Sequence, residues 1–207
     1  MMKPTELQKF VYWEHLERFG EPDASYRYDD PPESKTVEYP PIIDVLIWFA
    51  DEDLNMTTFS TVGMSNLPMN GCDHRCELHF AVEGTTNESN NKIIGSFLGN
   101  LTLYPFMYSL FFDWWHVLNN PYEIPLFPDA SSILFHPAFI KDGWEAIHHE
   151  SAHVKILNIV PITKNENEFR KERGINALLD YFYENEINYF TNRHNKAISA
   201  DAKKPRG

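Results

Sequence analysis

The sequence predicts an α+β protein, a single domain with a central mixed β-sheet flanked by helices. Apolar residues recur at helical spacing near both ends of the chain, and three short strand-like segments lie between them. No internal repeat and no linker divides the 207 residues, a length that suffices for one large domain. We therefore expect one domain over residues 1–195 and a disordered, polar and basic tail over residues 196–207.

The first expected element is a helix that begins after Thr5 and ends at Gly20. Thr5 and Gln8 have the spacing of a capping box, and glycine is a common residue at a helix end. The apolar side of this helix consists of Leu7, Phe10, Trp13, Leu16 and Phe19. Residues 21–41 are rich in proline and aspartate and predict an irregular connector, because proline cannot sit inside a strand ladder.

Three strands are expected next, at about residues 42–49, 56–63 and 75–82. The first of them is apolar at both alternations apart from Asp44. A strand of that kind is typically buried on both faces. The pattern therefore predicts a central position in the sheet for this segment.

A helix over residues 88–106 follows these strands, and we expect Pro105 to end it. Its expected apolar side consists of Ile93, Ile94, Phe97, Leu98 and Leu101. Residues 107–140 are aromatic and rich in turns. We expect short strands within them, around residues 111–118 and 132–135.

The C-terminal part of the domain predicts one strand and one helical region. Residues 154–160 are rich in β-branched side chains, and we expect Pro161 to close this strand. Residues 165–190 have helical periodicity, within which Gly174 is expected to weaken or break the helix.

Composition and charge restrict the functional classes. The chain is 43% hydrophobic and 14% aromatic, and residues 1–195 carry 14 basic and 29 acidic side chains, a net charge of −15. Such a body repels a phosphate backbone and attracts basic partners, so we expect no nucleic-acid binding. The N-terminus has no signal-peptide core and no apolar run is long enough for a membrane span. We therefore expect a cytoplasmic protein with no membrane partner.

The segment between residues 57 and 66 is the most distinctive part of the chain, because a β-branched run stops at a glycine before a small polar turn. A strand that contains Asp44 precedes it, TVGMSN occupies residues 61–66, and ELHF follows at residues 77–80. This order and spacing resembles the suppressor of fused (SUFU) domain family. The similarity extends over about residues 40–185 through segments at Trp115-His116, at Ile159 to Thr163 with Glu166 and Glu168, and at Gly174 with Leu178 and Leu179. A glycine of the family's histidine segment is absent here.

The resemblance implies a SUFU-like domain of the bacterial single-domain type that holds other proteins and is not an enzyme. In animals the family restrains a transcription factor by clasping a peptide, and similar bacterial proteins are thought to be immunity proteins of polymorphic toxin systems. It implies that this chain binds and neutralises a toxin domain, expected to be basic, or regulates one other protein partner, without a cofactor. The positions that carry the structural motif are Asp44, Thr61, Gly63, Glu77 and Pro161.

Two segments are candidates for the contact with that partner. The first follows Gly63, where we expect a positive φ, and consists of Met64, Ser65, Asn66, Leu67 and Met69. The same loop could instead plug one end of the sheet and satisfy its backbone. The second candidate is the aromatic run Trp114, Trp115 and His116, which serves as a partner contact if its side chains are exposed and as core if they are buried.

An alternative function is a small zinc metallohydrolase. His149 and His153 have the spacing of zinc ligands on one helix face, with Glu150 as general base and Glu168 as a third ligand. A strand-like segment begins directly after His153, which disfavours this interpretation because the helix would have to end at its own ligand. An exposed, histidine-rich loop before a strand is the expectation that we prefer.

Other catalytic signals are weak. The two cysteines, Cys72 and Cys76, exclude a disulfide framework, and their spacing with His74 and His79 does not match a closed zinc site. We expect ordinary packing for this group. The chain has neither a phosphate-binding GxxxxGK[ST] loop nor a GxSxG nucleophile elbow.

Overall fold

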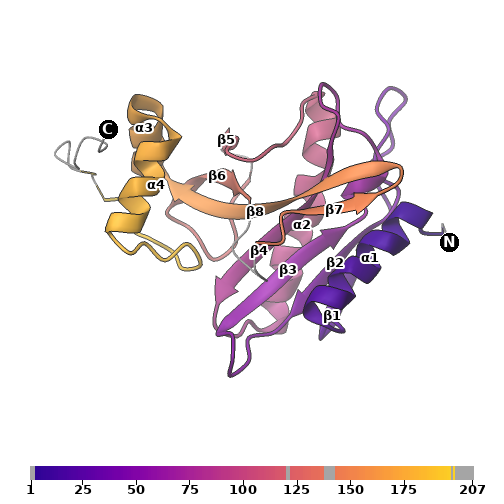
Figure 1. Ribbon diagram of the computed structural model, residues 1–207, viewed down its shortest axis with the longest axis horizontal. Coiled ribbons are helices and arrows are strands. Elements are labelled where there is room, and N and C mark those ends of the chain that lie inside the picture. Colours follow the sequence, from indigo (N-terminus) through magenta and orange to yellow (C-terminus); the bar gives the residue numbers. More distant parts are fainter. Residues whose placement is uncertain (1–2, 120–121, 138–142, 197, 199–207) are drawn as a thin grey trace.

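The computed structural model describes residues 3–119, 122–137, 143–196 and 198, and it has the expected α+β architecture (Figure 1). Helix α1 covers one face of a mixed sheet, helix α2 covers the other face, and α3 and α4 lie at one end. In chain order the elements are α1 (Glu6–Phe19), β1 (Ala24–Tyr28), β2 (Ile43–Trp48), β3 (Met56–Val62), a 3-10 turn η1 (Met64–Asn66), β4 (Arg75–Glu83), α2 (Glu88–Tyr108), β5 (Val117–Asn119), β6 (Ala130–His136), β7 (Ala146–His149), β8 (Ala152–Thr163), α3 (Lys164–Arg173) and α4 (Ile175–Glu184).

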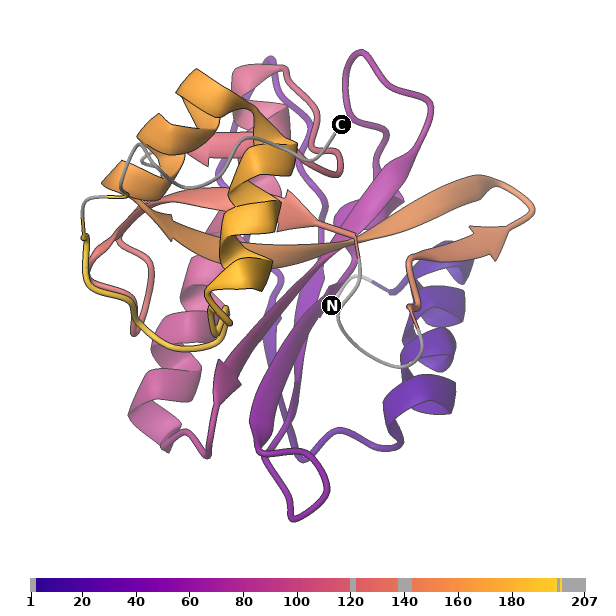
Figure 2. The ribbon, with the colours of Figure 1, turned by 60° about the vertical axis from the view of Figure 1, so that its left-hand side comes forward.

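The sheet runs in the order β1-β2-β3-β4-β8-β6-β5, and β7 pairs with β8. Strands β4 and β8 are parallel and all other pairs are antiparallel. The long strand β8 is shared, because β4 lies along one side of its first half while β7 and then β6 pair with its other side. Figure 2 shows α1 and the β7–β8 hairpin at one end of the molecule, and α3 and α4 at the other.

The burial on both faces predicted for the first strand is confirmed for β2, although this strand lies next to the edge strand β1 and not at the centre of the sheet. Val45 and Ile47 belong to the core beneath α2, whereas Leu46 and Trp48 belong to the core beneath α1. A third core holds α4 against β6 and β8, and its buried members are Leu134, Val160, Ile162, Leu178 and Phe182. Each layer of the protein therefore buries its own apolar face against the same sheet.

Helix α1 begins and ends as the sequence predicts, but only half of the expected capping box is present. The Thr5 hydroxyl accepts a hydrogen bond from the Gln8 N–H, and Gly20 has a φ of 76° at the C-terminal end. The Gln8 side chain turns instead toward the sheet, where its Nε2 donates to the carbonyls of Ile42 at 3.4 Å and Val62 at 3.3 Å. It therefore joins α1 to two strand ends.

The expectation of a connector over residues 21–41 is wrong for residues 24–28, which form the edge strand β1. The prolines that suggested a connector, Pro22 and Pro31, flank this strand and do not interrupt it. Helix α2 likewise continues through Pro105 to Tyr108 and ends at Ser109, whose φ of 52° is left-handed. One missing N–H therefore did not end a long, well-packed helix.

Gly174 breaks the predicted C-terminal helix into α3 and α4, and α4 ends at Glu184 instead of residue 190. Strand β8 continues through Pro161, which was expected to close it. The last β4–β8 pair is His79 with Asn158, so Pro161 lies beyond β4. Its missing N–H therefore costs no ladder bond on that side.

The strand expected around residues 111–118 forms only at its end, as β5, because Trp115 has a φ of 67°, outside the range of extended backbone. The strand expected around residues 132–135 is confirmed as β6. Of the predicted tail over residues 196–207, all but residues 196 and 198 lies outside the described residues.

Candidate functional site

A buried carboxylate organises the loop that follows β3. Glu77, on β4, is fully buried, and its Oε1 accepts from the Gly63 N–H at 2.8 Å, the Ser65 N–H at 3.0 Å and the Ser65 hydroxyl at 2.6 Å. Its Oε2 accepts from the Thr61 hydroxyl at 2.7 Å. We call this arrangement the Glu77 centre. Its donors come from one short segment, so the carboxylate holds the turn between β3 and η1 closed.

Hydrogen bonds in the Glu77 centre offset part of the effect of burying its carboxyl group. Burial raises the pKa of the Glu77 carboxyl, and the hydrogen bonds from Ser65, Gly63 and Thr61 oppose this rise. The guanidinium of Arg75 binds the same loop from another side, where Nη1 donates to the carbonyls of Ser65 at 2.7 Å and Asn66 at 2.8 Å. All these contacts are internal, so the centre positions the backbone and offers its oxygens to no outside molecule.

Gly63 has the positive φ that the sequence predicts, at 128°. A Cβ at this position would lie 2.2 Å from the carbonyl oxygen of Ile42 and 3.0 Å from Nε2 of Gln8. Two independent features therefore exclude a side chain here: the positive φ of the backbone and the close approach of a neighbouring strand end. This explains why the β-branched run must stop at glycine.

The expected exposure of the loop after Gly63 is wrong for most of its residues. Met64, Ser65 and Met69 are buried, whereas Asn66 and Leu67 are partly exposed. The sulfur atoms of both methionines lie within 3.8 Å of the Cys76 thiol in the core beneath α2. This segment therefore plugs the end of the sheet, the second of the two roles considered for it, because an apolar side chain gains more from the core than from water.

The aromatic run divides between core and surface. Trp114 is partly buried, its Nε1 donates to the Ile156 carbonyl at 3.1 Å, and the Lys155 ammonium lies 4.5 Å from its ring centroid. Trp115 is 38% exposed and packs edge-on against His136, and His116 is exposed. Trp115 and His116 therefore remain available to a partner, while Trp114 is tied to β8.

The histidine pair of the zinc interpretation lies in a β-hairpin and not on a helix. His148 pairs with His153 and His149 pairs with Ala152 across β7 and β8. Because consecutive strand residues point to opposite faces, His149 and His153 face away from each other. His149 instead contacts the Ser151 hydroxyl at 2.9 Å and packs on Phe10.

Glu168, the third ligand of the zinc interpretation, is also far from the two histidines. Glu168 lies on α3, beyond the whole length of β8, and a strand rises about 3.3 Å per residue. Its carboxylate lies 3.8 Å from the Lys164 ammonium. Within the described ranges, no three His, Cys, Asp or Glu side chains are grouped so that they could hold a metal ion.

Cys72, His74, Cys76 and His79 do not converge either. Cys76 is buried in the core beneath α2, where burial raises the pKa of its thiol well above the usual value. His74 has its Nε2 at 2.9 Å from the Phe112 carbonyl. His79 points to the opposite face of β4, toward α1. The group therefore packs as expected, as separate side chains.

Sequence reasoning missed a second buried polar group, formed by His15, Ser60 and His79. Nδ1 of His15 lies 2.7 Å from the Val11 carbonyl, and its Nε2 lies 2.6 Å from the Ser60 hydroxyl and 3.2 Å from Nε2 of His79. Burial lowers the pKa of His15 to about 4 and that of His79 well below its usual value. The signal was present, since His15 follows Leu7 and Val11 at a spacing of four on the buried helix face.

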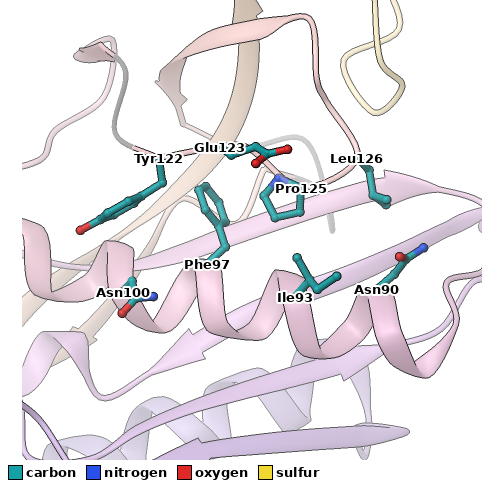
Figure 3. Close-up of a pocket in the computed structure, with 8 residues that line it drawn as sticks. All are labelled: Asn90, Ile93, Phe97, Asn100, Tyr122, Glu123, Pro125 and Leu126. Atoms are coloured by element: carbon teal, nitrogen blue, oxygen red, sulfur yellow. The ribbon is translucent and has the colours of Figure 1, made fainter.

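An apolar groove, which we call the α2 groove, lies between α2 and the segment over residues 122–126 (Figure 3). Its volume is about 500 Å³, and its lining residues are Asn90, Ile93, Phe97, Asn100, Tyr122, Glu123, Pro125 and Leu126. Ile93 is 54% exposed and Leu126 is 42% exposed. The sequence placed Ile93 on the buried side of the helix, and that expectation is wrong.

None of the helices in the described part of the chain is long and apolar enough to cross a bilayer. Ile93 and Leu126 give the α2 groove an exposed apolar surface. Apolar surface of this kind, rimmed by polar side chains such as Asn90 and Glu123, is typical of a site where another molecule docks.

Comparisons with known proteins identify a family and several solved structures with a similar fold. The family model for suppressor of fused protein (SUFU) matches residues 40–194. A SUFU homologue from Neisseria gonorrhoeae superposes with a TM-score of 0.66 at 14% identity, over 94% of this chain and 99% of that one. The crystal structure of a Sufu–Fu complex gives 0.63 at 12% identity, over 95% and 93%.

Drosophila Suppressor of Fused gives a TM-score of 0.57 at 12% identity, over 93% of this chain and 50% of that protein. No curated protein sequence matches the chain significantly. At these low identities the structural matches establish the shared fold, and the family model carries the assignment.

Proposed function

The chain belongs to the suppressor of fused family, and we propose that it is a non-enzymatic module that binds another protein. One observation carries the proposal: the α2 groove leaves Ile93 and Leu126 about half exposed next to polar side chains. Interfaces gain most of their binding energy from such apolar anchors within a polar rim. A relative that has been crystallised as a Sufu–Fu complex lends further support.

The finer form of the proposal is an immunity-type function in the cytoplasm. The net charge of −12 favours a basic partner, because opposite charge accelerates association. A toxin domain that acts on nucleic acid would be a basic protein of this kind. The domain would then neutralise the toxin by covering its surface, with the α2 groove and the exposed Trp115 and His116 as the contacts.

The test is co-expression in a bacterial host with the C-terminal domain of the protein that the gene immediately upstream encodes, a domain that we expect to arrest growth when it is expressed alone. We expect the chain to restore growth and to copurify with the toxin domain in a stable complex. Ile93→Glu should abolish protection, because a buried unpaired charge in an interface is costly. Met107→Glu is the matched control, since Met107 is exposed on the same helix outside the groove and should protect like the unchanged chain.

Growth that stays arrested with the unchanged chain present would contradict the immunity function. Protection by the Ile93→Glu variant would show that the α2 groove is not the contact surface, while the immunity function itself would stand. No described feature favours the zinc hydrolase as a second candidate, since its two histidines face opposite sides of a hairpin.

A further inference from the structure

The exposed edge of the sheet at β1 has the features of a second, different contact. Strand β1 ends the sheet, with β2 as its neighbour in the strand order. Alternate residues of an edge strand direct their N–H and C=O groups outward. Among the described residues, no backbone hydrogen bond joins the outer side of β1 to another segment. These groups are therefore free to pair with an added strand.

Acidic side chains stand at both ends of this edge. Glu21 and Asp23 precede β1, Asp29 and Asp30 follow it, and all four are exposed. The cation on the strand, Arg27, is already bound to Asp44 through Nε at 2.7 Å and Nη2 at 3.1 Å. The edge therefore presents open hydrogen-bonding groups between two negative ends.

A hollow of about 300 Å³ adjoins the edge on the α1 side of the sheet. Tyr12 and Trp13 of α1 line it together with Ser25 and Arg27 of β1 and Leu46 of β2. Trp13 is 61% exposed, which is unusual for so large an apolar ring. Every second side chain of a strand added to β1 would point to this side of the sheet, beside the hollow.

We propose that β1 binds an extended segment of a protein partner that pairs as an added strand, carries Lys or Arg at both ends and places an apolar side chain beside Trp13. This rests on the proposed protein-binding function and names the chemistry of the bound segment. The length of β1 sets the distance between the two basic ends of the bound segment. The five residues of β1 span roughly 17 Å, so the basic side chains should stand about six residues apart.

The same charges disfavour a second copy of this chain as the occupant. Two β1 strands related by a twofold axis would pair antiparallel, which places Glu21 and Asp23 of one copy beside Asp29 and Asp30 of the other. Like charges at both ends of such a pair repel. The acidic ends therefore act against self-association and toward a basic strand.

The first test uses synthetic peptides and the isotope-labelled full chain, followed by amide NMR shifts and hydrogen exchange. The probe is Lys-Lys-Val-Thr-Val-Thr-Val-Lys-Lys, compared with the same peptide carrying Glu in place of each Lys and with one carrying Pro in place of each Thr. We expect the basic peptide to bind at least about tenfold more tightly than either, because charge and main-chain donors are both needed. Shifts and slowed exchange should centre on residues 24–28.

Variants of the protein provide a second, independent test of the β1 site. The double change Asp29→Lys, Asp30→Lys should weaken binding of the basic peptide by roughly tenfold at low salt and by less at high salt. Asp180→Lys with Glu184→Lys, on α4, is the control with the same change in net charge and should bind like the unchanged chain. Trp13→Ala should weaken binding about fivefold without lowering Tm, because the ring is mostly exposed.

Equal binding of the basic and acidic peptides would overturn the inference, as would shifts centred on another element. Failure of the two proposals can be told apart with the toxin complex. If the Asp29→Lys, Asp30→Lys variant neutralises the toxin and binds it as tightly as the unchanged chain does, the β1 site is refuted and the protein-binding function stands. If the basic peptide binds β1 but no toxin is neutralised, the immunity function fails while the β1 site stands.

Discussion

The Glu77 centre and the α2 groove differ in what their residues face. In the Glu77 centre every carboxylate contact described above ends on a donor of the same domain, and the side chain is fully buried. In the α2 groove, Ile93 and Leu126 make an apolar surface that is about half open. The residues with the most distinctive spacing thus build the fold, whereas residues of ordinary type form the surface that we propose for a partner.

The largest expected effect is on stability, at the Glu77 centre. Glu77→Ala leaves the buried donors of Thr61, Gly63 and Ser65 without an acceptor, so we expect the free energy of unfolding to fall by about 3–5 kcal/mol. Urea unfolding measures it. Glu172→Ala, at an exposed position of α3, is the control and should change stability by less than about 0.5 kcal/mol. An equal small change in both variants would show that the centre does not hold the loop.

The role of Gly63 can be tested against Gly84, a second glycine with a positive φ. Gly63→Ala combines a strained φ with a clash against the Ile42 carbonyl, and we expect a loss of about 2–4 kcal/mol. Gly84 has a φ of 77° and nothing within 4 Å of its added Cβ, so Gly84→Ala should cost only about 1 kcal/mol. Thermal unfolding of the two variants separates clash from strain, and equal losses would argue against the close approach.

The buried His15–His79 pair should make stability depend on pH. The pKa of His15 is about 4 in the folded chain against an ordinary value of 6.5, and that of His79 is also lowered, so the unfolded chain binds more protons between these values. The free energy of unfolding should therefore fall as pH falls through this window, by about 2 kcal/mol between pH 7 and pH 5 from His15 alone.

Urea titrations at the two pH values check this dependence. His79→Leu should reduce this dependence to the part that His15 contributes, whereas His116→Ala, which removes an exposed histidine, should leave it unchanged. A slope that is identical in all three proteins would assign the pH dependence to other groups.

The smallest effect is expected in the β7–β8 hairpin. The double change His149→Ala, His153→Ala should move the free energy of unfolding by less than about 1 kcal/mol, because both side chains lie at or near the surface of a hairpin. Elemental analysis of the purified chain should find no stoichiometric zinc. One zinc ion per chain that disappears with the double change would reverse this interpretation.

The strands and helices that sequence analysis predicted correctly are those whose pattern is local. The apolar run of β2 and the spacing of Thr5 and Gly20 around α1 depend on nearby residues alone. Strand β1 was missed because its short alternation stands between prolines, and Pro105 was overrated because tertiary packing carries α2 past it. The order of the strands within the sheet was not predicted, because neither local patterns nor the family resemblance contain it, and it comes from the structure alone.

The candidate site was harder to predict because its residues meet only through the fold. Met64 and Met69 look like surface residues of a polar loop, yet β4 places Cys76 beneath them. Ile93 has the periodicity of a core residue, but the segment over residues 122–126 leaves it open. The His15–His79 contact spans 64 residues of sequence, so no local pattern reports it.

The most direct test of the division between the Glu77 centre and the α2 groove is hydrogen–deuterium exchange of the chain alone and bound to the proposed partner domain. We expect binding to slow exchange in α2 and residues 122–126, around Ile93 and Leu126. We expect no change in the loop after Gly63, because the amides of Gly63 and Ser65 are already bound to Glu77. Protection centred on that loop, with exchange in the α2 groove unaltered, would contradict the assignment of the Glu77 centre to the fold and of the groove to the partner.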